Sequence, residues 1–286
     1  MKRLKTLCAW LILLGVSAAQ AQFAAAVNPP RFEVSVEPGQ ITRQVLEITH
    51  AAAGSGTYRV YTADWTMDTA GALTFYDTIQ PGSCRPWVAI ERRELTITVG
   101  ARVRYRFEVA PTADAKPQEC RFALMIESKP QDIVTSDASS FPMSGRIAVI
   151  VYVSIGGARA QLVAGEPELV NLDNRRVPSV LVRNSGNATG RLSGILKGSD
   201  AAGKSIELSP ESVPILPGQT RRVALQPYEA PLRSLPGVAP SASAAAREPP
   251  IRLPITVRGT LEYGLGGAGR IDLDSVYAEP ARPAAR

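Results

Sequence analysis

The sequence predicts an all-β protein made of two immunoglobulin-like β-sandwich domains, and three observations carry this prediction. Short runs rich in β-branched and aromatic residues recur along the chain, separated by turn signals at roughly ten-residue spacing. No stretch shows the sustained 3.6-residue periodicity of an amphipathic helix. Roughly 265 residues follow the first 21, a length that suits two domains better than one.

Residues 1–21 have the pattern of a cleavable secretory signal peptide. Three basic residues stand among the first five, an apolar run extends over residues 7–16, and the small residues Ala19-Gln20-Ala21 end the segment. We expect cleavage near Ala21. The apolar run is shorter than the about 20 residues that a spanning helix needs, so we expect no stable membrane insertion. An uncleaved anchor and retention in the cytoplasm are the alternatives.

The first domain is expected to cover residues 22–156. Its predicted strands are 31–36, 45–49, 58–65, 73–76, 87–90, 95–99, 102–109 and 120–127, followed by a polar, turn-rich segment over 128–144. The last strand, 145–155, is apolar on both faces, with Ile147, Val149, Val151 and Val153 on one and Ala148, Ile150 and Tyr152 on the other. A half-exposed strand would alternate apolar and polar residues, so this one is either buried on both sides or offered to a partner.

Gly156-Gly157 marks the expected start of the second domain, which covers residues 157–277. Its predicted strands are 180–183, 190–197, 204–208, 221–225, 251–263 and 270–276. The segment 227–250 is rich in Pro, Ala and Ser and is expected to form a long mobile loop, and the tail 278–286 is expected to be disordered.

Gly264 to Gly269 match the G-x-G-x-x-G pattern of dinucleotide-binding loops, but residues 270–274 alternate like a strand, which favours a glycine hairpin. Asn187-Ala188-Thr189 fits the glycosylation pattern and is interpreted as a plain turn.

The residue content disfavours catalysis and metal binding. The chain has one histidine, His50, so most hydrolytic constellations cannot be assembled, and we expect no enzyme activity, no metal and no cofactor. Removing residues 1–21 would leave 29 basic and 26 acidic residues, a net charge of +3 that is too weak to indicate nucleic acid binding. Cys84 and Cys120 are expected to form a disulfide, with a metal site or a reactive thiol as the alternatives.

In the order of its elements the chain resembles the PapD-like periplasmic chaperones of pilus subunits. The N-terminal strand and turn read RFEVSVEPGQ, a strand with Tyr58 and Trp65 and a strand near Trp87 follow, and Val109-Ala110-Pro111 closes a later strand before the long apolar one. In the second half, residues 182–187 and 214–219 are similar to the family's strand-turn pieces.

The resemblance implies two domains in an L shape, a periplasmic location and a chaperone that caps secreted fimbrial or coat-type subunits and delivers them to an outer-membrane usher. It implies that Ile147, Val149, Val151 and Val153 complete the subunit's unfinished sandwich by strand addition. The opposite face, with Ile150 and Tyr152, is the alternative donor face.

By the same resemblance, Arg31 and Arg146 would hold the subunit's terminal carboxylate. The alternative function is a non-enzymatic structural or adhesive protein of the envelope whose last strand is buried internally.

Overall fold

The computed structural model describes residues 25–52, 54–68, 71–134, 140–172, 174–228 and 251–278, and the side chains of 131–143 and Leu265 are outside the description. The expected signal peptide, all but the first two residues of the 227–250 segment, and residues 279–286 therefore lie outside the described residues. No helix in the described ranges is long and apolar enough to cross a membrane.

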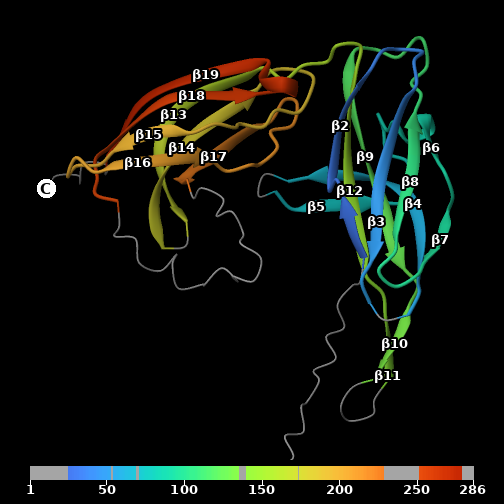
Figure 1. Ribbon diagram of the computed structural model, residues 1–286. Helices are drawn as coiled ribbons and strands as arrows, with labels where there is room; N and C mark the ends of the chain where they lie inside the picture. Colours follow the sequence, from blue (N-terminus) through green and yellow to red (C-terminus); the bar gives the residue numbers. More distant parts are fainter. Residues whose placement is uncertain are drawn as a thin grey trace, which may run out of the picture.

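The two domains form an L, and the predicted two-domain all-β fold is confirmed (Figure 1). The first domain packs two sheets face to face. One sheet has the order β1 (Ala25–Asn28), β3 (Thr42–His50), β8 (Arg102–Val109), β6 (Val88–Ile90). The other has the order β2 (Arg31–Val36), β12 (Arg146–Ile155), β9 (Gln118–Ser128), β4 (Gly56–Met67), β5 (Leu73–Tyr76), with β7 (Glu94–Ile97) also paired to β4.

The second domain is one seven-stranded sheet that curls until its outer strands meet. The order is β13 (Leu162–Leu172), β14 (Arg175–Asn184), β17 (Thr220–Pro227), β16 (Ser205–Pro210), β15 (Leu196–Ser199), β18 (Ile255–Tyr263), β19 (Gly269–Tyr277). Strands β13 and β19 lie against each other, so the sheet encloses its own apolar core. Strands β18 and β19 pair antiparallel across residues 264–268, which confirms the glycine hairpin.

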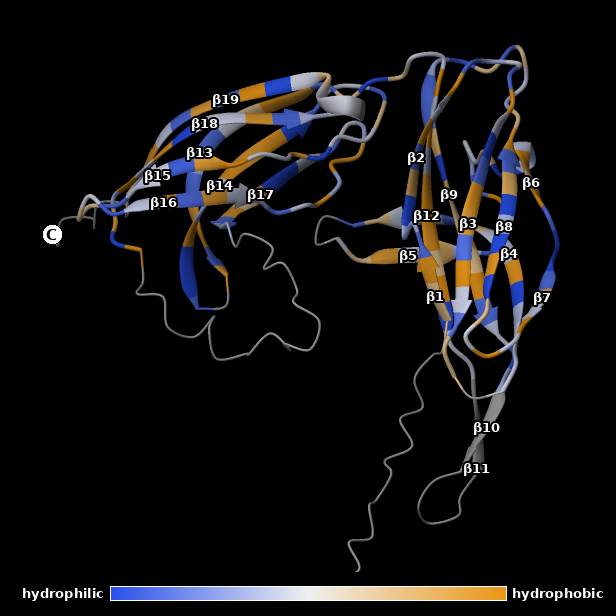
Figure 2. Cartoon of the chain, in the orientation of Figure 1, coloured by the Kyte–Doolittle hydropathy of each residue, from blue (hydrophilic) through white to orange (hydrophobic). Residues whose placement is uncertain are grey.

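Alternation along the strands explains the core of the first domain (Figure 2). On β8, Tyr105, Phe107 and Val109 are buried while Arg102, Arg104 and Arg106 are exposed. The Phe107 ring meets those of Phe32 and Phe122 edge-on, with centroids 5.1 Å and 6.0 Å apart. Such edge-to-face pairs add to the stabilisation from burial.

Strands that lack this alternation were not predicted from the sequence. Strand β13 carries Gly165 and Pro167, and its register with β14 shifts between Ala164 and Pro167, which hides its period. The polar segment 128–144, predicted to be turns, contains the short strands β10 (Gln131–Val134) and β11 (Ser140–Met143), which pair as a hairpin. Strand β15 begins at Leu196, and Gly190 makes only an isolated bridge with Ile215.

Two glycines separate the sheets of the two domains. Strand β12 ends at Ile155, and Gly156 and Gly157 both have positive φ, +58° and +75°, which favours glycine. The following residues already pack on the second domain, because the amides of Ser185 and Asn187 donate to the carbonyls of Gln161 and Arg159. A Cβ on Gly186 would come within 2.3 Å of the Arg159 carbonyl, so only glycine allows this approach.

A buried carboxylate joins the domains beside these glycines. Glu119 on β9 has a side chain only 3% exposed, and it accepts hydrogen bonds from the Thr189 amide (2.7 Å) and hydroxyl (2.6 Å). Asn187 Nδ2 donates to the Pro117 carbonyl at 3.0 Å. The turn Asn187-Ala188-Thr189 is therefore a docking turn. At the other end of the junction, Gln219 Nε2 donates to the Met67 carbonyl at the end of β4.

Cys84 and Cys120 are both buried free thiols in the core of the first domain. A hydrogen bond between the two thiols, reinforced by burial, raises the pKa of Cys84. The loop that carries Cys84 is held by Asp64, which accepts hydrogen bonds from the Gln80 amide (2.9 Å) and the Ser83 hydroxyl (2.7 Å). We propose that these adjacent thiols form the expected disulfide when an external disulfide oxidant accepts their two electrons.

We expect protein isolated from an oxidising compartment to contain no titratable thiol after denaturation. Reduction should lower the free energy of unfolding by about 4 kcal/mol, since it releases the loop between residues 84 and 120 in the unfolded chain. Thiol titration in denaturant and urea unfolding with and without reductant check this. Two free thiols in protein never exposed to reductant would contradict it.

Asn184 ties together the turns at one end of the second domain. It is 0% exposed, its Nδ2 donates to the carbonyls of Ala188 and Ile215 (both 2.8 Å), and its Oδ1 accepts from the amides of Gly186 (3.0 Å) and Gln161 (3.2 Å). The Asn184→Ala variant should lose about 3–5 kcal/mol of unfolding free energy, because it leaves buried backbone groups without partners.

The described tryptophans, Trp65 and Trp87, both belong to the first domain, so two probes separate the domains. In the Asn184→Ala variant, the lower unfolding free energy of the second domain should shift the transition measured by circular dichroism. The transition measured by tryptophan fluorescence, which reports on the first domain, should stay in place. Asn171→Ala, at an exposed position of β13, is the control. A matching shift in both variants would show that the Asn184 bonds contribute little.

Glu119 should make stability depend on pH. Burial raises its pKa above the ordinary value of 4.5, so at pH values between 4.5 and the folded pKa the folded protein holds a proton that the unfolded chain has released. Its contribution to unfolding free energy is therefore greatest below pH 4.5 and is lost as pH rises through the folded pKa.

The difference in unfolding free energy between wild type and Glu119→Gln should shrink as pH is raised from about 4 to about 8. Urea unfolding at intermediate pH values measures this, with Glu37→Gln, on the exposed turn after β2, as control. A difference that stays constant or grows with pH would refute this role of the buried carboxylate.

Candidate functional site

One face of the β2–β12–β9–β4 sheet is turned away from the core of its own domain and toward the second domain. We call it the outer apolar face. Its buried members are joined by Leu216 of the second domain, and four further side chains are only partly buried. The buried residues are Ala63, Trp65, Met67, Ala123, Met125 and Tyr152; the partly buried ones are Tyr61, Phe75, Ala148 and Ile150.

The structure corrects the choice of donor face on the last strand. Val149, Val151 and Val153 are 0% exposed and lie in the core of their own domain, and Ile147 packs against the same core. The reason is the register with β9, in which these residues pair with Leu124, Phe122, Cys120 and Ile126, all of them core residues. The alternative face, with Ala148, Ile150 and Tyr152, is the one that points outward.

Strand β12 is paired on both edges along only part of its length. Strand β9 pairs with all of it, from Arg146 to Ile155. The parallel partner β2 begins at Arg31, which lies opposite Ile150. Among the described strands, none pairs with the second edge of residues 146–149, and we call this stretch the free edge of β12.

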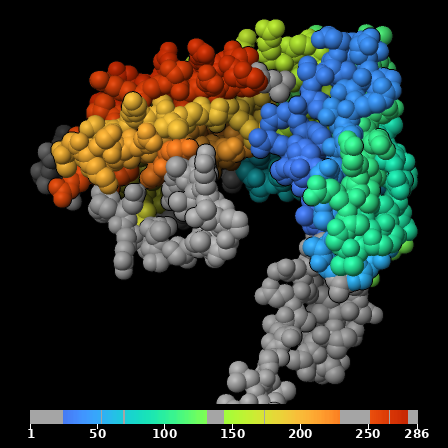
Figure 3. Space-filling model, in the orientation of Figure 1, coloured from blue at the N-terminus to red at the C-terminus, as the bar shows by residue number. Residues whose placement is uncertain are grey.

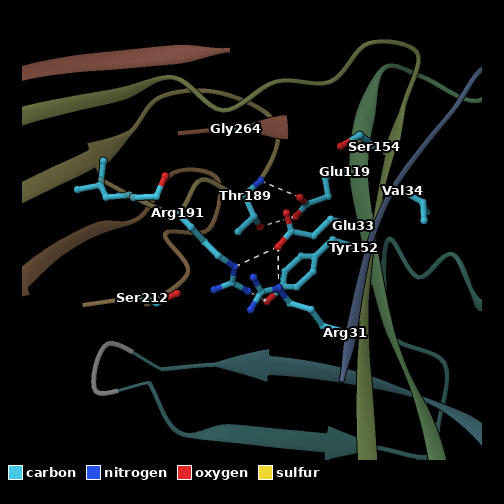
Figure 4. Close-up of a pocket in the computed structure, with 12 residues that line it drawn as sticks. Arg31, Glu33, Val34, Glu119, Tyr152, Ser154, Thr189, Arg191, Ser212 and Gly264 are labelled. Carbon is cyan, nitrogen blue, oxygen red and sulfur yellow. Dashed lines mark hydrogen bonds and ion pairs between the residues drawn. The ribbon is translucent and has the colours of Figure 1, made fainter. Parts of the chain in front are cut away.

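A cavity of about 210 Å³ lies at the junction of the domains, on the same face as Ile150 and Tyr152. Figure 4 shows its charged residues converging from both domains. Arg31 and Arg191 each donate an Nε–H to Glu33 Oε1, at 2.9 Å and 3.3 Å. Arg191 Nη2 also donates to the Tyr152 hydroxyl at 2.8 Å, and its guanidinium lies 5.1 Å from the Tyr152 ring centroid.

The two predicted anchors do not meet. Arg146 stands at the opposite end of β12, where its Nη1 donates to the Tyr61 hydroxyl at 3.4 Å, and this bond raises the pKa of Arg146. The position opposite Arg31 is Ile150, four residue steps along β12 from Arg146, or about 13 Å. The cation beside Arg31 is Arg191. The sequence alone does not indicate this pair, because Arg191 belongs to the second domain and meets Arg31 only in the folded protein.

The cavity is chemically suited to a carboxylate. Two guanidinium groups can hold one through paired hydrogen bonds. Burial raises the pKa of Tyr152, so its hydroxyl keeps its proton and is a further donor. Glu33 and Glu119 also line the cavity, and Glu119 lies 3.6 Å from a third guanidinium, that of Arg121. Within the described ranges, no group of three or more His, Cys, Asp or Glu side chains could hold a metal ion.

Figure 3 shows the concave angle between the two domains. The cavity and the outer apolar face are adjacent, because Tyr152 belongs to both. Cys84 and Cys120 are not among the residues that line the cavity. No protein-family model matches the sequence, and no curated protein matches it either.

Solved structures that resemble this one contain fimbrial chaperones. The Salmonella enterica SafA pilin in complex with the SafB chaperone matches at 10% identity with a TM-score of 0.46, covering 90% of this chain and 99% of the other. The Acinetobacter baumannii CsuC–CsuE chaperone–tip subunit complex matches at 10% identity and a TM-score of 0.42, covering 90% and 100%.

The Pseudomonas aeruginosa CupB2 chaperone matches at 10% identity and a TM-score of 0.41, covering 88% of this chain and all of the other. In each of these matches about one residue in ten is identical.

Proposed function

We propose that the protein is a periplasmic chaperone that caps secreted fimbrial or coat-type subunits by strand addition and delivers them to an outer-membrane usher. The observation that carries the proposal is the free edge of β12 at residues 146–149, bordered by the partly buried Ala148 and Ile150. A subunit that lacks one strand exposes an apolar groove and unpaired backbone groups, and both would promote aggregation.

Strand addition at this edge would satisfy both needs of the subunit. The unpaired amides and carbonyls of residues 146–149 would continue the subunit's sheet. Ile150 and Ala148 would enter its groove, and complete burial of a side chain the size of Ile150 contributes about 1.5–3 kcal/mol. The side chains first assigned to this role, from Ile147 to Val153, instead support the strand from within the first domain.

The cavity supports a second contact with the subunit, through the carboxylate at the end of its chain. Arg31 and Arg191 would hold the terminal carboxylate of the subunit, so that its last strand runs from the cavity along β12. Arg191 takes the place first assigned to Arg146, whose exposed position near the free edge suits a contact with the body of the subunit. The test must separate this function from a structural role in which β12 only completes its own domain.

We expect the Ala148→Asp and Ile150→Asp variants to lower the periplasmic yield of a co-expressed subunit at least about tenfold, since a charge in the subunit's groove would remain unpaired. The subunits to test are small secreted proteins encoded beside this gene. Quantitative immunoblotting of periplasmic extracts measures the yield.

Ala89→Asp is the matched control, because Ala89 is exposed on β6 in the other sheet. All three variants should keep the wild-type melting temperature to within a few degrees. Val149 and Val151 are unsuitable targets, since a charge in the core would unfold the domain. Undiminished yields with folded Ala148 and Ile150 variants would overturn the proposed function and favour the structural or adhesive alternative.

A further inference from the structure

The carboxylate of Glu33 already occupies the space between the two cavity arginines. A single oxygen, Oε1, accepts the Nε–H of Arg31 at 2.9 Å and the Nε–H of Arg191 at 3.3 Å (Figure 4). We propose that Glu33 is an internal stand-in for the carboxylate of an incoming chain and is displaced when that chain binds. The inference rests on the proposed carboxylate site and adds its regulation.

The three side chains differ in how firmly they are held. Arg191 is 16% exposed and is fixed by the hydroxyl and the ring of Tyr152. The side chain of Glu33 is 37% exposed, and the two arginines are the only hydrogen-bond partners of its carboxylate among the described residues. Arg191 therefore stays in place as a receptor, while the carboxylate of Glu33 can rotate out toward solvent.

The donors of the site are only partly used by Glu33. The Nη atoms of Arg31 make no hydrogen bond to the described part of the chain, and Glu33 takes only one N–H from each guanidinium. A bound carboxylate could form two parallel bonds with a guanidinium, a stronger geometry than a single contact. The ion pair between Arg31 and Glu33 joins two solvent-exposed side chains, and such pairs contribute little to stability, so displacing Glu33 from Arg31 costs little.

The position of Glu33 also affects the charge balance of the cavity. Without Glu33, the guanidinium groups of Arg31 and Arg191 would face each other from different domains, and the other carboxylate of the cavity, Glu119, already lies 3.6 Å from Arg121. Glu33 offsets part of this positive charge, and the full charge of the two arginines faces a ligand only when Glu33 leaves. A purely structural bridge between the domains would behave differently, because removing its charge would weaken the site.

Acetate is the probe, with acetamide as its uncharged counterpart. Binding is followed through the side-chain Nε–Hε resonances of Arg31 and Arg191 at constant ionic strength. We expect Glu33→Gln to bind acetate about threefold to tenfold more tightly than wild type, because the internal competitor has lost its charge. Acetamide should produce no saturable shift. Glu37→Gln, which removes the same charge just after β2, should match wild type.

The outcomes separate this inference from the proposed function. Tighter acetate binding by Glu33→Gln, abolished by a further Arg191→Gln substitution, supports the stand-in. Equal or weaker binding by Glu33→Gln overturns it while leaving the carboxylate site intact. No saturable shift in any variant overturns both the stand-in and the carboxylate site, and the Ala148 and Ile150 variants then still decide whether the free edge caps subunits.

Discussion

The period-two geometry of β12 is the constraint on which the rest of the structure depends. Each second side chain must enter the core of the first domain, and Val149, Val151 and Val153 do so completely. The residues between them are thereby forced outward, onto the face that the second domain partly covers. One apolar strand thus serves two surfaces, which is why it lacks the polar face of an ordinary edge strand.

The cavity at the domain junction combines charge from both halves of the chain. Arg31 comes from the first strand of its sheet, Arg191 from the second domain, and Tyr152 from β12 itself. Their placement depends on the docking turn at Thr189, which holds the second domain against Glu119. A change in the angle between the domains would separate the cations without altering either domain.

Much of the fold could be predicted from the sequence, because apolar alternation marks strands directly. Strands β2, β5 and β8 begin and end where the pattern predicts. Strand β13 could not be found, since Gly165 and Pro167 interrupt it, and the sequence pattern could not say which face of β12 was internal. That choice depends on the register with β9, a long-range pairing that period alone does not determine.

The site itself was only half predictable, because nothing local links Arg31 to Arg191. The two residues are 160 positions apart and meet through the domain junction. The resemblance pointed to Arg31 through its place in the first strand, and it pointed to Arg146 through its place on the last. The register then put Arg146 at the far end of that strand.

The packing of residues 158–161 against the second domain has a mechanical consequence. Because this linker moves with the turn around Gly186, the pivot between the domains is reduced to Gly156 and Gly157. A rotation of the second domain about these two residues would change the position of Arg191 relative to Arg31. Such a rotation would have to break the hydrogen bonds between Glu119 and Thr189.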